Sequence, residues 1–201
     1  MPVVRRFLIA PALARLIRRS VGASRLAEAH MPTGPARHVH IQIAEDAAHL
    51  VLTTADGASE RCPLPTAQAE ALAEAAAGHV AYDRSEVALD GAVLRIDSFT
   101  VPGPLDIAEA SFADDAGACA FAAPVWLGPE ITHEPHCDTR SIALHSLSLA
   151  AEMPITDAII DAVLDMLDQQ ELRALLGRAR SAEAPAPTGE DQDRMDAAVA
   201  A

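Results

Sequence analysis

The feature that most constrains the fold is a pair of alternating segments in the middle of the chain that carry acids among apolar residues. The first, 92–99, reads AVLRIDSF, and the second, 105–112, reads LDIAEASF. Alternation with period two predicts β-strands, so Asp97 and Glu109 each lie on one face of a strand. A carboxylate in the centre of a strand needs a cation, a metal ion or water nearby. The two segments therefore predict a sheet with a charged face.

Patterns along the rest of the chain predict more strands and four helices. An Asp-Gly pair between two alternating segments is a strong hairpin signal. The expected strands are 3–9, 27–31, 37–44, 48–54, 79–89, 92–99, 105–112 and a last strand that ends near residue 144. The expected helices are 12–19, 66–77, 113–122 and 156–176.

The charge composition limits the classes of partner. The chain has 201 residues, with 29 acids, 15 basic residues that are all arginine, and a net charge of -14. Nucleic-acid binding needs basic stripes that displace counterions, so this composition argues against it. The three cysteines are widely spaced and odd in number, which predicts no disulfide framework and favours a reducing cytoplasm. No apolar run is long enough to span a membrane.

The N-terminal segment allows two interpretations. Residues 1–27 hold six arginines and no acid, which taken alone resembles an amphipathic transit peptide. The alternative is that 3–9 is the first strand of the domain. We favour the strand, because cleavage would remove it and leave an open sheet edge.

Several short motifs occur in an informative order. The chain reads R-R-F-L at 5–8, D-x-F at 97–99, E-x-S-F at 109–112 and W-L-G-x-E-x-T at 126–132. These motifs resemble those of the CYTH family, the triphosphate tunnel metalloenzymes, which includes inorganic triphosphatases, thiamine triphosphatases and class IV adenylate cyclases. The resemblance covers roughly residues 2–144. It implies an α+β fold with an antiparallel barrel or tunnel of about eight strands and peripheral helices.

Most of the charged positions of the family motifs are changed in this chain. Both glutamates of the opening E-x-E are absent, and Arg6 stands where the family has a lysine. Tyr82 replaces a second lysine, and His38, His40 and His136 stand at three arginine positions. Arginine does not deprotonate at ordinary pH, so Arg6 can bind phosphate but cannot act as a general base.

The resemblance implies a polar tunnel in which basic side chains hold phosphate oxygens and carboxylates hold a divalent metal ion. The candidate phosphate contacts are Arg6, Arg25, His40, Arg84 and His136. The candidate metal ligands are Glu109 and Asp97, with weakly bound Mg²⁺ or Mn²⁺ as the expected cofactor. A salt bridge with Arg84 is an equal alternative for Asp97. A zinc site of His38, His40, His136 and Cys137 is a further alternative, although its spacing matches no known zinc motif.

Two classes of function fit these residues, and no catalytic residue is assigned. The first is a catalytically weak or inactive module that binds phosphate or polyphosphate, and the second is an active metal-dependent triphosphatase with a rebuilt site. The expected organisation is a tunnel domain at 1–146, a helical extension at 147–180 and a disordered acidic tail at 181–201. The extension offers a surface for a homodimer, and neither nucleic acid nor a membrane is an expected partner.

Overall fold

The computed structural model describes residues 3–32, 34, 37–89, 92–134, 137–145 and 153–183. These residues form nine strands and five helices. The strands are β1 (Val3–Ile9), β2 (Ser24–His30), β3 (Arg37–Ala44), β4 (Ala48–Thr54), β5 (Ser59–Leu64), β6 (Gly78–Leu89), β7 (Ala92–Val101), β8 (Leu105–Phe112) and β9 (Leu127–Glu130). The helices are α1 (Pro11–Val21), α2 (Thr66–Ala73), α3 (Asp115–Ala120), α4 (Thr139–His145) and α5 (Asp157–Glu183).

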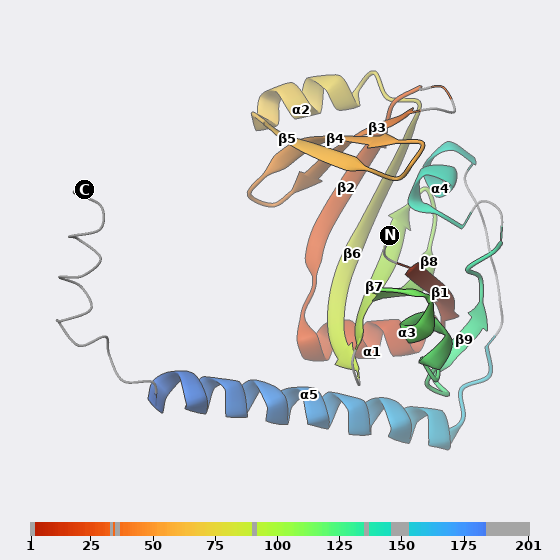
Figure 1. The fold of residues 1–201 in the computed structure, drawn as a ribbon, viewed down its shortest axis with the longest axis vertical. Coiled ribbons are helices and arrows are strands. Elements are labelled where there is room, and N and C mark those ends of the chain that lie inside the picture. The colour runs from red at the N-terminus through yellow and green to blue at the C-terminus, as the bar shows by residue number, and fades with distance from the viewer. Residues whose placement is uncertain are drawn as a thin grey trace. The chain divides into compact units, whose positions relative to one another are not determined.

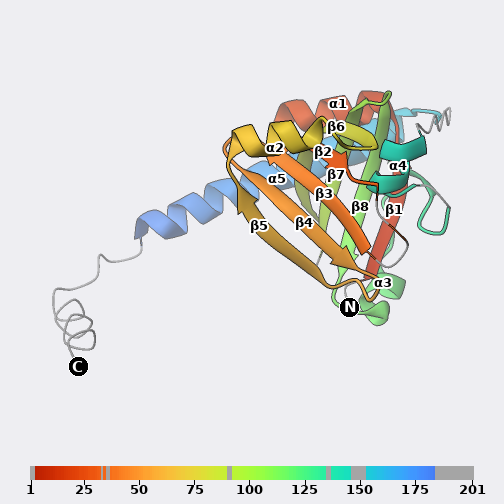
Figure 2. The same ribbon diagram turned by 90° about the horizontal axis from the view of Figure 1, so that it is seen from above.

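All nine strands belong to one antiparallel sheet, in the order β5-β4-β3-β2-β6-β7-β8-β1-β9. The sheet is strongly curved, and β3, β4 and β5 arch away from the long strand β6 (Figures 1 and 2). Among the described residues the sheet does not close, and β5 and β9 are its two edges. The structure therefore confirms the predicted α+β fold with a tunnel-like antiparallel sheet and peripheral helices.

The outer face of the sheet, which carries Ile41, Leu94 and Ala108, is apolar and covered by helices. Helix α2 lies across β3 and β4, where Ile41 is fully buried (Figure 1). Helix α1 contacts β6 and β8, and its residues Leu13 and Ile17 are buried with Leu94 and Ala108. Burying one such aliphatic side chain contributes about 1.5–3 kcal/mol, so this face supplies much of the stability of the sheet.

Local sequence explains where α1 begins and ends. Pro11 occupies the first helical position, where its missing N–H costs nothing. Leu13 and Ile17 are four residues apart and therefore share the face that packs on the sheet. The helix ends at Gly22, whose φ of 82° is readily adopted by glycine, and whose N–H bonds to the carbonyl of Arg18. This end leads the chain directly into β2.

The inner face, which carries Tyr82, Arg84, Asp97 and Glu109, is polar in its middle and apolar at one end. Helix α4 packs against that apolar end, where Ile142 is buried in one cluster with Tyr82. At Gly78 a Cβ atom would lie 2.3 Å from the carbonyl oxygen of Ala143, so only glycine permits this approach. The inner face is therefore covered at one end by α4.

The predicted last strand, ending near residue 144, is wrong. The last strand is β9 at Leu127–Glu130, and Thr139–His145 forms α4 instead. Asp138 accounts for the helix, because it accepts hydrogen bonds from the Ser141 N–H at 2.9 Å and the Ser141 hydroxyl at 2.7 Å. Asp138 is therefore the N-cap of α4 and satisfies the backbone N–H of Ser141, which in an extended strand would bond to a neighbouring strand. Ile142 and Ala143 then reach the core from the helix.

The chain divides into two compact units, Met1–Leu167 and Asp168–Ala201. The first unit continues past residue 146 and includes the beginning of α5, where Val163 and Met166 are buried in the outer core with Trp126. In the second unit the described residues, 168–183, are the continuation of the same helix. The expected tail at 181–201 lies mostly outside the described residues.

The helices that the structure describes include none that is both long enough and apolar enough to cross a membrane.

We expect truncation after residue 152 to destabilise the first unit, because it removes Val163 and Met166 from the outer core. Loss of two large buried side chains typically costs about 2–5 kcal/mol each, which should lower the urea midpoint measurably. Truncation after Leu167 is the matched control, since it keeps both residues and removes only the second unit. Equal midpoints for the two truncations would contradict the packing described for α5.

Candidate functional site

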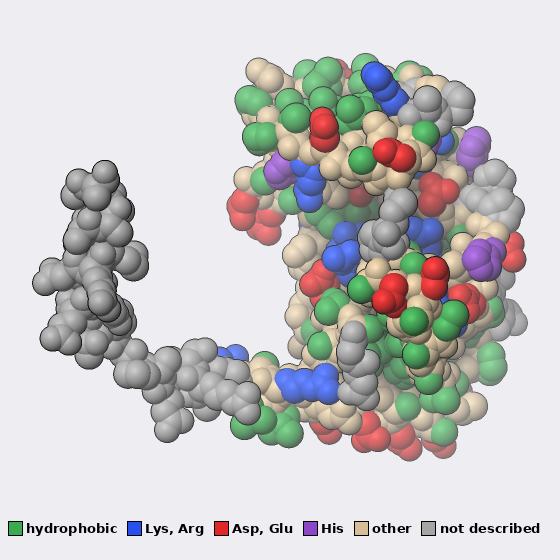
Figure 3. Space-filling view, in the orientation of Figure 1, with side chains coloured by type: hydrophobic (Ala, Val, Ile, Leu, Met, Phe, Trp, Pro, Cys, Tyr) green, Lys and Arg blue, Asp and Glu red, His purple; other side chains and the backbone are tan. Residues whose placement is uncertain are grey.

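The middle of the inner face brings together charged residues from four strands. Arg84 on β6 lies opposite Asp97 on β7. Glu109 on β8 lies opposite both Arg6 on β1 and Arg95 on β7. Residues directly opposite each other in a sheet share a face, so these five side chains form one charged surface. Figure 3 shows arginine and acidic side chains close to one another around a hollow in this side of the molecule.

Arg84 and Asp97 form a bidentate ion pair. The Arg84 guanidinium donates two hydrogen bonds of 2.7 Å, one to each carboxylate oxygen. The Asp97 side chain is only 11% exposed, and the Arg84 Cζ lies 5.1 Å from the centre of the Tyr82 ring. Burial alone would lower the pKa of Arg84, but the hydrogen bonds and charge of Asp97 raise it. Of the two roles weighed for Asp97, the salt bridge is therefore the one present.

Arg6 and Glu109 form a second ion pair on the same face. The Arg6 Nε donates to a Glu109 oxygen at 2.9 Å, and both side chains are about a quarter to a third exposed. The backbone N–H of Arg6 donates to the Thr132 hydroxyl at 3.0 Å, and its carbonyl accepts from the N–H of Ile131 at 2.8 Å. These bonds join β1 to the segment after β9 and fix the position of Arg6.

Glu28 on β2 is the centre of a buried hydrogen-bond network. Its carboxylate accepts from the Tyr82 hydroxyl at 2.6 Å and from Gln42 at 3.3 Å, and lies 3.2 Å from His30 Nε2. Burial alone would raise the pKa of Glu28, but hydrogen bonds from His30 and Tyr82 and the charge of His40 lower it to about 2. Glu28 is therefore an ionised carboxylate within the site.

Two histidines flank this carboxylate. The rings of His30 and His40 are stacked, with centroids 5.0 Å apart and an angle of 24° between the planes. The Nε2 of His40 lies 4.0 Å from Glu28. His38 is two residues away on the same face of β3, and its buried Nδ1 has no hydrogen-bond partner among the described residues. The predicted convergence of His40 and Arg84 on one face is thus present.

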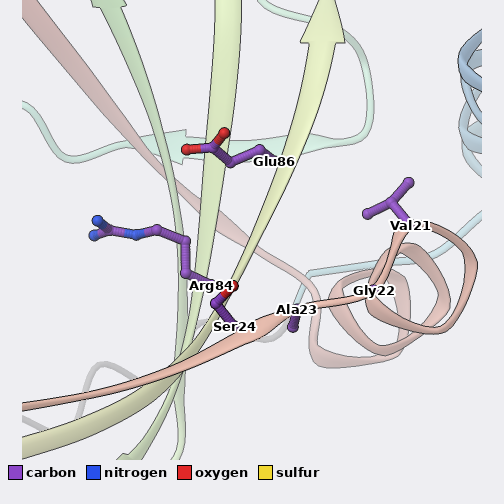
Figure 4. A pocket seen from close by; sticks show the side chains of 6 residues that line it. All are labelled: Val21, Gly22, Ala23, Ser24, Arg84 and Glu86. Carbon is purple, nitrogen blue, oxygen red and sulfur yellow. The ribbon is translucent and has the colours of Figure 1, made fainter. Parts of the chain in front are cut away.

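A pocket of about 450 Å³ opens beside this face where α1 runs into β2 (Figure 4). Figure 4 shows Arg84 and Glu86 on β6, with Ser24 at the start of β2. Glu86 accepts a hydrogen bond of 3.2 Å from Arg95, and both side chains are partly exposed. The pocket therefore gives solvent access to Arg84 from the end of the sheet opposite α4. Its lining residues are Val21, Gly22, Ala23, Ser24, Arg84 and Glu86.

Arg25 is not brought together with the other predicted site residues. It lies opposite Asp83, on the outer face, and donates hydrogen bonds to Asp83 at 3.0 Å and to Thr100 at 3.1 Å. Its two neighbours in the strand, residues 24 and 26, lie on the inner face. Matching the family motif one position off therefore explains why Arg25 was predicted on the inner face but lies on the outer face. His136 lies outside the described residues.

The two predicted metal ligands share the inner face, but each is already bonded to an arginine. A divalent ion bound by both Asp97 and Glu109 would have to displace Arg84 and Arg6. In the part of the chain that the structure describes, no three side chains of His, Cys, Asp or Glu are arranged to hold a metal ion. The arrangement of these residues therefore fits a resident metal ion poorly.

Sequence reasoning missed Glu28, His30 and Arg61. Glu28 lies between two apolar positions of β2 and opposite Gln42, so the alternation along the strand indicates that Glu28 lies on the polar face. Glu28 and His30 both lie within the predicted strand 27–31, and pairing that strand with 37–44 places them on the same face as His40 and Gln42. Arg61 on β5 donates to the side-chain amide oxygen (Oε1) of Gln42, and no sequence pattern indicates that contact.

Comparisons with known proteins support the fold at low sequence identity. No family model matches the chain, and no curated protein matches it. A structure described as the hypothetical protein NE1496 is 21% identical, with a TM-score of 0.57 over 72% of this chain and 98% of that one. A second, described as the inorganic triphosphatase NE1496, is 20% identical, with a TM-score of 0.54 over 72% and 95%. Inorganic triphosphatases are among the proteins that the sequence motifs resemble, so the predicted resemblance is confirmed at the level of the fold.

We expect the stability of the protein to depend on pH through Glu28. Its pKa is lowered in the folded state from 4.5 to about 2, so its stabilising contribution is present above pH 4.5 and is lost as the pH falls towards 2. The shift corresponds to about 3 kcal/mol at most. Urea denaturation between pH 6 and 3 should show this loss in the native protein and a smaller one in Glu28→Gln. An equal loss of unfolding free energy between pH 6 and 3 in the two proteins would contradict the role of Glu28.

Proposed function

We propose that this chain is a cytoplasmic binding module of CYTH fold, which holds a phosphate or polyphosphate ligand on its inner face and hydrolyses it poorly or not at all. The observation that carries the proposal is the pairing of each predicted metal-binding carboxylate with an arginine, Asp97 with Arg84 and Glu109 with Arg6. Hydrolysis of a triphosphate relies on a divalent ion that offsets charge on the transferred phosphoryl group. Here both carboxylates predicted to hold that ion are paired with arginines.

The same arginines support phosphate binding without a metal ion. Guanidinium groups match phosphate oxygens with two parallel hydrogen bonds and stay charged at every physiological pH. Arg84 lines the pocket that opens at the end of the sheet, and Arg6 is about one-third exposed. A phosphate group can therefore approach Arg84 through the pocket, and the exposed part of Arg6 offers a second contact on the same face. The fold shared with the inorganic triphosphatase NE1496 supports a phosphate-bearing ligand for this face.

The alternative is an active triphosphatase with a rebuilt site, in which a ligand brings its own Mg²⁺ or Mn²⁺ and displaces the ion pairs. Asp97 and Glu109 lie diagonally across from each other on the neighbouring strands β7 and β8, so both carboxylates face the same side of the sheet. The three cysteines are free; Cys62 and Cys119 are exposed, and Cys137 is buried.

We expect phosphate release from inorganic triphosphate, with Mg²⁺ or Mn²⁺ present, to be at least about a hundredfold slower than with an intact CYTH triphosphatase, since each lost preorganised charge costs about that much. A malachite-green assay against such an enzyme as positive control measures it. Metal-dependent turnover at a comparable rate would instead establish the alternative.

We also propose that the second unit pairs with a second copy of itself. Its helix exposes Leu172, Leu175 and Leu176, each at least half exposed, and the described residues of this unit provide no core to cover them. Glu171 and Arg178 stand seven residues apart along one side of this leucine row. An antiparallel pair would bring Glu171 of one copy beside Arg178 of the other.

This pairing predicts a dimer in solution. Light scattering on the full chain should give twice the mass of the monomer, and replacing Leu172, Leu175 and Leu176 by serine should reduce it to the monomer. A monomer at all concentrations would rule out the pairing and leave the phosphate site unaffected.

A further inference from the structure

Two imidazoles share one carboxylate on the inner face. Glu28 lies 3.2 Å from His30 Nε2 and 4.0 Å from His40 Nε2, and the two rings are stacked at 5.0 Å. The His30 and Glu28 side chains are 5% and 8% exposed, and His40 is 17% exposed. Water therefore screens this group weakly, and the charges must balance largely among the residues themselves.

The single negative charge of Glu28 compensates one positively charged imidazole but not two. Glu28 has a charge of -1 and compensates one imidazolium, so a second would face the first across a 5.0 Å stack without a counterion. The other chargeable residues around the pair add no nearby negative charge from β3, β4, β5 or β6. They are His38 on β3, His49 on β4, Arg61 on β5, and Tyr82 and Arg84 on β6. Helix α4, which contacts β2, contributes Arg140 and His145.

We propose that the inner face takes up a proton when it binds a phosphate-bearing anion, and that the His30–His40 pair receives this proton. The anion supplies the counterion that Glu28 alone cannot provide for a second imidazolium. This inference rests on the proposed function, because it concerns the same inner face and the same class of ligand. It makes the affinity for phosphate a function of pH in the range where imidazole titrates.

A hydrogen bond and a ring contact connect the histidine pair to the proposed phosphate contact at Arg84. Tyr82 bonds to Glu28 through its hydroxyl, and Arg84 lies over the ring of the same tyrosine. Tyr82 and Glu28 thus connect Arg84 to the histidine pair, and an anion at Arg84 would act on the pair electrostatically across these two side chains. The pKa of His40 is lowered, chiefly by burial and in part by His30 and Arg61. The free protein therefore holds an imidazole whose protonation a bound anion can favour.

Calorimetric titration tests the inference, with inorganic triphosphate as the probe and EDTA present, at pH 6, 7 and 8. Each titration is made in two buffers of different ionisation enthalpy, so that the difference in heat counts the protons taken up. For the native protein we expect the affinity to rise as the pH falls, by up to about tenfold per pH unit for uptake of one proton. We expect His40→Gln and His30→Gln to lose most of this uptake.

The control is His79→Gln, which changes a histidine on the outer face that bonds to the carbonyl of Ala73. Inorganic triphosphate itself also takes up protons between pH 6 and 8, and this contribution is the same in His79→Gln as in the native protein. If His40→Gln and His30→Gln fold and take up as many protons as His79→Gln, the inference is overturned while the binding function stands. If His30→Gln does not fold, His40→Gln decides alone. Absence of triphosphate binding at every pH would instead contradict the proposed function.

Discussion

The buried ion pair between Arg84 and Asp97 is the interaction around which the inner face is organised. Asp97 is 11% exposed and sits on a central strand, so an unpaired carboxylate there would be costly. Two hydrogen bonds of 2.7 Å offset part of that cost, although burial still raises the pKa of Asp97, and they orient the guanidinium towards the Tyr82 ring. Tyr82 in turn bonds to Glu28, which connects the arginine half of the face to the histidine half. Removing one member would leave its partners buried without compensation.

The outer face of the sheet contributes to stability, and the inner face is the proposed binding surface. The outer face is packed by α1, α2 and the beginning of α5, and it holds the curved sheet in shape. The inner face is closed at one end by α4, whose approach at Gly78 leaves no room for a side chain. At the other end the pocket beside Ser24 and Glu86 remains open. This open end exposes Arg84 and is where the proposed phosphate ligand would enter.

The sequence predicted most strands and all of the helices up to α3 because alternation and caps act locally. It also predicted that His40, Arg84, Asp97 and Glu109 share a face, since strand period is a local property. The helix at Thr139–His145 is not predicted, because the resemblance to the family places a strand over these residues, whereas Asp138 caps a helix there. Arg25 was misplaced by one residue of register, which transfers a side chain to the opposite face. The partners of Glu28 come from β3 and β6, and such contacts follow from tertiary packing alone.

The central claim is that arginines rather than a metal ion hold the phosphate ligand. Binding of inorganic triphosphate in EDTA at pH 7, compared among the native protein, Arg84→Ala and Arg18→Ala, tests it most directly. Arg18 pairs with Asp83 away from the inner face and is the matched control. The account predicts metal-free binding that is retained in Arg18→Ala and weakened about tenfold or more in Arg84→Ala, as expected for loss of a charged hydrogen-bonding group. Binding that requires Mg²⁺, or that is equal in the two variants, would contradict it.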